Sequence, residues 1–406
     1  MNKEHAHIRY IAVRCALALV VLLVFTRCVE PFELPESNFE EVFIVEATIT
    51  NTNEFHTVKI SNTAALGTSE AVPEQNASVT VLENDRAIAF EEIVPGTYRS
   101  VEAFEALPGT DYRLRIETQN GTAMVSETVR LSTTSNIGSV VAQKAIDENG
   151  IEGVNITVNS TDPSGESRYY RYFYEETYKI IAPRWSPFEA YVVTQDPLTV
   201  DIRPRQREER TCFKTVDATG SLLFDTTNQA EDNVVALPIR FIERSDFIIA
   251  HRYSILVKQL VQRRSAYEFY NNLQKLSNQG SLLSQNQPGF LIGNITVSGG
   301  TKKVSGFFDV ASISENRIFF NYEDFFEDVT EPNYAVGCDV FLSPLLETDQ
   351  FGNSPLALAI ENETLEFFTD SGSPRPPGEG PFSMVPTICG DCNVLGTNIV
   401  PEFWID

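Results

Sequence analysis

The sequence predicts a mostly β protein, with an N-terminal immunoglobulin-like β-sandwich at residues 39–132 and a larger β-rich domain at residues 139–406 that carries one α-helix. Three observations predict this class. Apolar residues recur with a period of two in many short segments, beginning with Val42–Thr50. Turn residues such as Pro108-Gly109 separate these segments. The 27 Phe and 14 Tyr residues favour strands.

The first domain is predicted from seven short strands at regular spacing, which is typical of a sandwich. They are Val42–Thr50, Thr57–Ser61, Ser78–Leu82, Ala87–Phe90, Gly96–Ser100, Tyr112–Glu117 and Ala123–Val129. A turn precedes Tyr112, an arrangement that resembles the tyrosine corner, in which the phenol bonds back to upstream backbone. We therefore expect Tyr112 and Tyr98 to be structural.

A polar linker at residues 133–138 leads into the second domain. Its expected strands are Gly153–Val158, Arg168–Tyr174, Ala190–Val193, Ile239–Ile242, Tyr253–Val261, Phe290–Ile295, Val304–Phe308 and Asn316–Phe320. The one helix is expected near residues 265–278, because Ser265 and Glu268 form a capping box before an apolar period of helical spacing.

Residues 1–27 have the features of an export signal. Basic residues precede the apolar run Cys15–Phe25, which is shorter than the roughly 20 residues of a bilayer-spanning helix. Cys28 follows, as in bacterial lipoprotein signals, where this cysteine becomes the lipidated first residue. Arg27 departs from the small residue usual at that position. An ordinary cleaved signal and an uncleaved anchor are the alternatives. Residues 28–38 would then form a flexible tether.

The charge limits the classes of partner. The formal charge is −25, and removal of residues 1–27 leaves 27 basic and 55 acidic residues, a charge of −28. This argues against nucleic acid as a partner and against adhesion to anionic headgroups, so we expect contact with the membrane through the lipid anchor. No cofactor is expected.

Four cysteines lie beyond the anchor: Cys212, Cys338, Cys389 and Cys392. In an exported chain an even number favours disulfides, and four allow three pairings that the sequence does not separate. The Cys389-x-x-Cys392 spacing is also found in zinc and redox sites. Asp391 between the two thiols disfavours a thiolate, so disulfides are the favoured interpretation.

Several short motifs, taken in order, resemble a family of exported lipoproteins from Bacteroidota, catalogued as domain of unknown function 4249. They are Cys28-x-x-Pro31, Val42–Asn51, Gly109-x-x-Tyr112-x-Leu114, Tyr253-Ser254-x-Leu256-Val257, Tyr267 with Tyr270, Gly293–Ile295, Gly306–Phe308, Cys389-x-Asp391-Cys392, Gly396–Asn398 and Pro401-x-Phe403-Trp404. The resemblance implies a lipoprotein anchored in the outer membrane and facing outward, associated with a TonB-dependent transporter. It implies no catalytic residues.

Catalytic chemistry has little support in the sequence. His56 and His251 lie in strand-like segments without a nucleophile setting, and two histidines are too few for a three-histidine zinc site. Carboxylate pairs such as Glu323-Asp324 could serve a glycosidase, but 55 acidic residues produce close pairs by chance.

Two aromatic features are candidate ligand or partner contacts. Tyr170, Tyr172 and Tyr174 alternate along one face of a predicted strand, and Trp185 lies in a proline-flanked loop. Packing in a core is the alternative for all four. The sequence as a whole favours a non-catalytic accessory lipoprotein that assembles with a TonB-dependent barrel and helps capture its ligand. A surface adhesion or scaffold lipoprotein that binds protein or glycan is the second interpretation, and a glycan hydrolase is the third.

Overall fold

The computed structural model describes residues 42–63, 71–278, 291–298, 302–327, 330–350, 352–372 and 377–406. The described chain is mostly β, as predicted, and contains three α-helices. The expected export signal, Cys28 and the tether at residues 28–38 lie outside the described residues. Within the described ranges, no helix combines the length and the apolar character needed to cross a membrane.

The N-terminal strands form one continuous hydrogen-bonded path in the order β19-β1-β2-β6-β5-β4-β7-β8-β18. This path differs from the two separate sheets of a sandwich. The strands that residues 42–126 contribute are β1 (Val42–Thr50), β2 (Thr57–Asn62), β3 (Val72–Pro73, paired with β2), β4 (Ser78–Glu83), β5 (Arg86–Val94), β6 (Thr97–Ser100), β7 (Tyr112–Glu117) and β8 (Ala123–Ser126).

This sheet encloses the first core. Side chains at alternate positions of β1, from Phe43 to Ile49, point into it, as the period of two predicts. The Tyr112 hydroxyl accepts a hydrogen bond from Leu107 N at 2.9 Å and donates to Glu83 Oε1 at 3.0 Å. The expected tyrosine corner is therefore present. Tyr98 is also buried, and its hydroxyl donates to Glu74 O, so both tyrosines are structural.

The second core lies between two layers of strands. One layer is the three-stranded sheet β16-β10-β9, and the other is the segment β14-β11-β17-β19 of the large sheet. The strands are β9 (Ile137–Ile146), β10 (Glu152–Thr161), β11 (Tyr169–Ile181), β14 (Thr211–Asp217), β15 (Leu222–Asp225, paired with β11), β16 (Asn233–Glu243) and β17 (Tyr253–Gln262).

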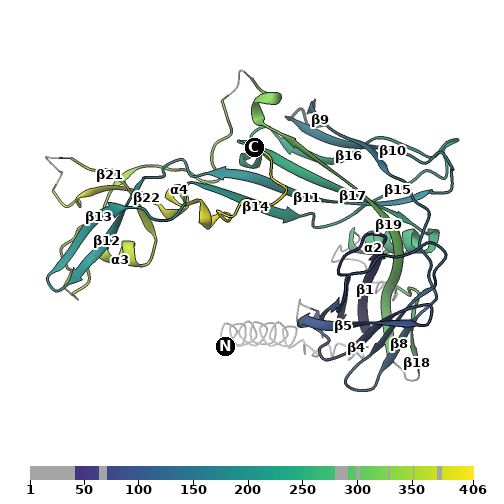
Figure 1. The fold of residues 1–406 in the computed structure, drawn as a ribbon. Coiled ribbons are helices and arrows are strands. Elements are labelled where there is room, and N and C mark those ends of the chain that lie inside the picture. Colours follow the sequence, from purple (N-terminus) through teal and green to yellow (C-terminus); the bar gives the residue numbers. More distant parts are fainter. Residues whose placement is uncertain are drawn as a thin grey trace, which may run out of the picture.

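The two cores share one strand, β19 (Lys303–Phe320). Its first half pairs in parallel with β1, from Val42 opposite Lys303 to Thr50 opposite Ala311. Its second half pairs antiparallel with β17 and begins at the next residue, Ser312, which lies opposite Val261. Figure 1 shows β19 running from the N-terminal sheet into the sheet that contains β17 and β11.

The first core consequently contains residues from far along the chain. Ile295 of β18 (Ile295–Ser298) and Val304, Phe308 and Val310 of β19 pack with the N-terminal strands. The chain therefore leaves the N-terminal unit near residues 133–138 and later returns to it. Residues 295–310 complete this unit.

Hydrogen bonds from Ser132, just before the linker, and from Asn51 hold the chain at the point where β19 changes partner. Ser132 Oγ donates to Val261 O at 2.6 Å and accepts from Ser312 N at 2.9 Å. Asn51 Oδ1, just after β1, accepts from Ile313 N at 2.7 Å. Hydrogen bonds thus connect the chain segments that meet at the junction between the two cores.

A third group of elements forms an arm that Figure 1 shows at the left. It contains the hairpin β12 (Phe188–Gln195) and β13 (Leu198–Pro204), the sheet of β20 (Phe341–Leu342), β22 (Phe382–Pro386) and β21 (Leu365–Asp370), and the short helices α3 (Pro355–Glu361) and α4 (Thr387–Gly390). Neither short helix was predicted, because each is too brief to show an apolar period. The described residues also form 3₁₀ turns at Phe247–Ile249, Tyr322–Asp324 and Cys392–Val394.

Helix α2 (Arg264–Asn278) is the predicted helix and begins one residue earlier than expected. Ser265 therefore lies inside its first turn and is not the N-cap, which corrects the capping-box interpretation. The helix packs on the outer face of β19 through Phe269 and Tyr270, which contact Phe307.

Close backbone approaches accompany this packing. A Cβ on Gly306 would lie 2.4 Å from Val45 O, and a Cβ on Gly293 would lie 1.7 Å from Gly306 O. Only glycine fits at either position.

Candidate functional site: a cleft beside helix α2

A cleft of about 470 Å³ lies between helix α2 and the outer face of β1 and β19. This volume is within the range of small-molecule sites. Strand alternation forms its floor, since Ile44, Glu46 and Thr48 point away from the first core. Strand β11 supplies Arg171 and Phe173 along the same cleft. The remaining lining residues are Val45, Ala47, Thr57, Lys59, Leu260, Phe269, Tyr270, Leu273, Ser305, Gly306 and Phe307.

The Arg171 guanidinium is held in the cleft by two aromatic rings and one hydroxyl group. It lies 3.5 Å from the ring centre of Tyr270 and 4.5 Å from that of Phe173. Its Nε donates to Ser221 Oγ at 3.1 Å. No carboxylate of a described residue lies within the 4.0 Å of an ion pair. Two aromatic rings therefore fix the orientation of a cation that has no ionic partner among the described residues.

The wall opposite β1 is aromatic. Phe269 and Tyr270 of α2 and Phe307 of β19 form a small buried cluster whose ring centres lie 5.4–6.3 Å apart. Burial raises the pKa of the Tyr270 phenol, so the phenol is neutral at physiological pH. The cleft thus offers rigid apolar area beside one fixed charge.

A buried polar pair lies next to the cleft. Asp309 of β19, opposite Thr48 of β1, is 1% exposed, and Gln262 is 3% exposed. Gln262 Nε2 donates to Asp309 Oδ2 at 2.9 Å, whereas Asp309 Oδ1 and Gln262 Oε1 have no hydrogen-bond partner among the described residues. Burial raises the pKa of the Asp309 carboxyl. A proton on Oδ1 would satisfy both remaining oxygens through a cyclic pair with the Gln262 amide.

The charged lining has one positive charge in excess. Arg171 and Lys59 are basic and Glu46 is acidic, while the whole chain carries −25. Glu46 and Lys59 are cross-strand neighbours, and both side chains are exposed at the mouth of the cleft. The half-buried Arg171 is therefore the inner charge of the site.

The tyrosines that the sequence offers as candidate contacts lie on the other face of β11. Tyr170 and Tyr172 are 0% and 1% exposed and belong to the second core. Their hydroxyls donate to Asp232 Oδ2 and Gln259 Oε1. The expectation that they contact a ligand is therefore wrong, because neither reaches the surface. Tyr174 is partly buried and packs against the same core, with its phenol pKa raised by burial.

Trp185 also packs inward. It is partly buried against the second core, and its indole Nε1 is buried without a hydrogen-bond partner among the described residues. A recognition tryptophan would direct this N–H toward solvent or a ligand. These contacts agree with core packing, the alternative given above for Trp185.

The four predicted disulfide cysteines are paired as Cys212–Cys392 and Cys338–Cys389. The structure thus selects one of the three possible pairings. The two halves of the Cys-x-x-Cys motif bind different partners, so the motif is neither a zinc site nor a redox pair.

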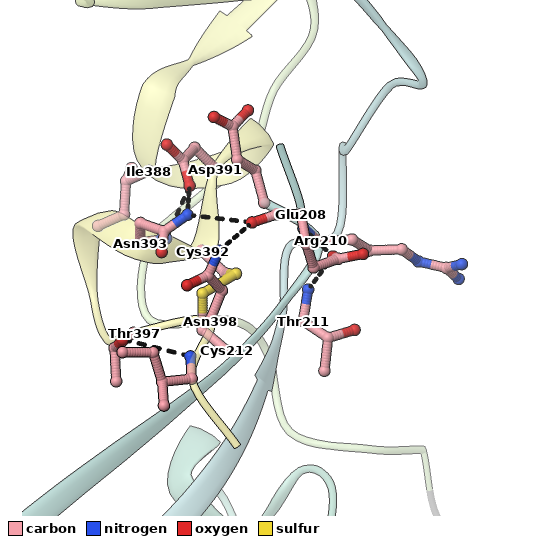
Figure 2. The surroundings of a disulfide bond; sticks show 12 residues. Glu208, Arg210, Thr211, Cys212, Ile388, Asp391, Cys392, Asn393, Thr397 and Asn398 are labelled. Carbon is pink, nitrogen blue, oxygen red and sulfur yellow. Dashed lines mark hydrogen bonds between the residues drawn. A yellow bond between two sulfur atoms is a disulfide. The ribbon is translucent and has the colours of Figure 1, made fainter. Parts of the chain in front are cut away.

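Figure 2 shows the C-terminal segment held against the start of β14 around Cys212–Cys392. Asn398 Nδ2 donates to Glu208 O at 2.9 Å, and Thr397 exchanges two backbone hydrogen bonds with Phe213. Further on, Trp404 packs edge-on against Phe213 and Phe319. These contacts give the tail motif a structural role.

The histidines and the other carboxylates do not form a site. His56 is buried, bonds to Phe104 O through Nε2, and has its pKa lowered by burial. The pKa of His251 is also lowered by burial. Glu366 pairs with the buried Arg205 at 2.7 Å. No group of three or more His, Cys, Asp or Glu side chains in the described chain is placed to hold a metal ion.

The sequence model of a family described as "Domain of unknown function (DUF4249)" matches residues 29–317, more than two thirds of the chain. The chain belongs to this family. A search of curated proteins gives no match. The matched range contains the first core, most of the second core, β19 up to Arg317 and every residue of the cleft, so the cleft lies within the DUF4249 region.

Two motifs by which the sequence resembles DUF4249 proteins meet beside the cleft. Asn294 Nδ2 donates to Phe308 O, and Asn294 Oδ1 accepts from Phe308 N, both at 2.8 Å. The amide thereby joins the segment before β18 to β19. The Gly293–Ile295 and Gly306–Phe308 motifs consequently form one structural unit.

Sequence reasoning missed Arg171 and Phe173, although it named the strand that carries them. The available signal was the alternation itself. Three large aromatics on one strand face are most often core, which leaves the face with the arginine to line a surface feature. The aromatic wall could not be predicted without knowing how α2 packs on β19.

Proposed function

We propose that the protein is a lipid-anchored, non-catalytic accessory protein of the outer membrane that faces outward, assembles with a TonB-dependent transporter barrel and helps capture its ligand. The observation that carries ligand capture is the cleft beside α2, because it combines aromatic area with an oriented arginine on a rigid sheet.

Anchoring is supported by the sequence around Cys28. An apolar run of signal length precedes this cysteine, and a segment with prolines and glutamates, residues 29–41, separates it from β1 in the sequence. Two or more acyl chains on one residue hold a protein on a bilayer without a spanning helix. The acidic surface would leave the anchor as the contact with the membrane.

Purification from native membranes in mild detergent tests the proposal. We expect an outer-membrane barrel to co-purify with the wild-type protein, and intact cells to expose the protein to added protease. The variant Cys28→Ser is the matched control, and we expect it to leave the membrane fraction with its fold unchanged. Recovery of the wild type as a lone monomer, or complete protection from protease in intact cells, would contradict the proposal.

A further inference from the structure

Arg171 differs in its partners from the other partly buried arginines of the described chain, whose guanidinium groups donate to carboxylate, carbonyl or amide oxygens. Arg168 donates to Gly165 O and Thr226 O, and Arg252 donates to Ile405 O and Asn321 Oδ1. Arg205, Arg240 and Arg317 each have a carboxylate oxygen within 3.2 Å. Arg171 has two aromatic rings and one hydroxyl. A guanidinium withdrawn from water normally gains an anion in exchange. None of the described residues supplies such an anion to Arg171.

Asp309, whose carboxyl interacts electrostatically with Arg171, does not fill this role. Its carboxyl is buried with Gln262, and one proton would satisfy both of their free oxygens. Burial raises the pKa of Asp309, which favours that neutral form. Arg171 therefore retains its full charge toward the cleft.

The aromatic rings do not form a cage for a cationic ligand. Arg171 itself lies over Tyr270 and Phe173, at 3.5 Å and 4.5 Å from the ring centres. A second cation there would meet like charge from Arg171 and Lys59. An anion meets an oriented guanidinium that can donate two parallel hydrogen bonds.

The rest of the cleft is suited to the apolar part of a ligand. Phe269, Phe307, Leu260, Leu273 and Ile44 line it, together with the hydroxyls of Ser305, Thr48 and Thr57. Leu273 is 42% exposed although it lies on the inner side of α2, so a ligand there would cover apolar surface that now faces water.

We propose that the cleft binds a small amphiphilic anion, with its carboxylate or sulfonate on Arg171 and its apolar body against Phe269, Phe307 and Leu273. This inference rests on the proposed role in ligand capture and names the class of ligand.

A pair of fluorescent probes of almost the same shape tests the inference: 8-anilinonaphthalene-1-sulfonate, which is an anion, and N-phenyl-1-naphthylamine, which lacks the sulfonate. We expect one high-affinity site on the wild-type protein, with the anion bound at least about tenfold more tightly than the neutral probe, as one charge-assisted hydrogen-bonded pair implies. Arg171→Gln should abolish this preference and leave affinity for the neutral probe nearly unchanged.

The control is Arg115→Gln, which removes an exposed arginine of β7 far from the cleft lining. It should keep the preference of the wild type. Equal affinity of the wild type for both probes, or an unchanged preference in Arg171→Gln, would overturn the inference, and the wild-type comparison holds even if Arg171→Gln fails to fold. Co-purification of a barrel is measured separately, so either proposal can fail alone.

Discussion

Single side chains at the junction of the two cores combine deep burial with polarity. Asp309 and Gln262 lie under α2, and Asn294 bonds both backbone groups of Phe308 beside them. Buried polar groups of this kind are stabilising only when every donor and acceptor is satisfied. The protonation of Asp309 therefore has a measurable effect on stability.

Asp309→Asn should preserve or raise stability at pH 7, because the amide supplies a permanent donor to Gln262 Oε1 in the same shape. Asp309→Ala should cost about 1–3 kcal/mol, since it leaves the Gln262 amide without a partner. Chemical unfolding of the three proteins at pH 7 measures both effects. Equal losses in the two variants would show that the carboxylate is ionised in the folded state.

The pH dependence follows from the same carboxyl. Its folded pKa is raised by burial above the model value of 3.8, so the folded state binds a proton that the unfolded state has lost. Stability from this group is therefore complete below about pH 4 and is lost as pH rises toward the folded pKa. Asp309→Asn should remove that slope.

The residues of β11 show how much of the cleft could be predicted from the sequence. The alternation in Arg168–Tyr174 correctly predicted a strand with two distinct faces. Which face is buried depends on the three-stranded sheet that covers it, and β9 of that sheet was not predicted. The alternation alone therefore leaves ligand contact and core packing both open for the tyrosines, and it does not single out Arg171.

At the scale of elements, β19 depends on glycine for its contact with β1. A Cβ at Gly306 would meet the Val45 backbone at 2.4 Å, and β1 cannot move without disturbing the first core. We expect Gly306→Ala to cost about 1–3 kcal/mol. Gly220→Ala is the matched control, because nothing lies within 4 Å of its Cβ position and its φ is not positive. Thermal unfolding compares them, and similar midpoints for both variants would contradict the argument.

The two disulfides should differ in their contribution. Cys212–Cys392 closes 180 residues and Cys338–Cys389 closes 51, so the first restricts the unfolded chain more. Replacing either pair by serines should cost about 2–4 kcal/mol, with the first pair costing about 1 kcal/mol more by chain entropy. Unfolding in denaturant of the two double variants measures this, and the reverse order would show that other contacts decide the difference.

The sequence predicted most strands but divided β19 into two, Val304–Phe308 and Asn316–Phe320. Polar residues Asp309, Ser312, Ser314 and Glu315 interrupt the apolar pattern, and an interrupted pattern indicates a loop. In the structure these residues are the junction itself, where the strand passes from one partner to the other. The polar side chains of Asp309, Ser312 and Ser314 form hydrogen bonds with Gln262, Thr133 and Ile137.

At the scale of the whole molecule, the N-terminal unit is not continuous in sequence. A fragment of residues 39–132 lacks Ile295, Val304, Phe308 and Val310 of its core. Their burial is worth about 6–12 kcal/mol, comparable to the total stability of a domain. We expect this fragment to be unfolded in circular dichroism and amide NMR spectra.

The control for the fragment restores what it lacks. Fusion of residues 291–312 to residues 39–132 through a flexible linker returns β18 and the first half of β19, and should recover a folded spectrum. A cooperative unfolding transition in the fragment without this addition would show that the first core is sufficient alone.

In the shared strand β19, the side chains that face the two cores must keep one alternating register along its whole length. Val304, Phe308 and Val310 face the first core and Phe320 faces the second, all at even-numbered positions. One residue inserted between Ala311 and Ser312 would turn one half of β19 inside out, while two would preserve the facing of both halves. Length changes at this point are therefore tolerable only in steps of two.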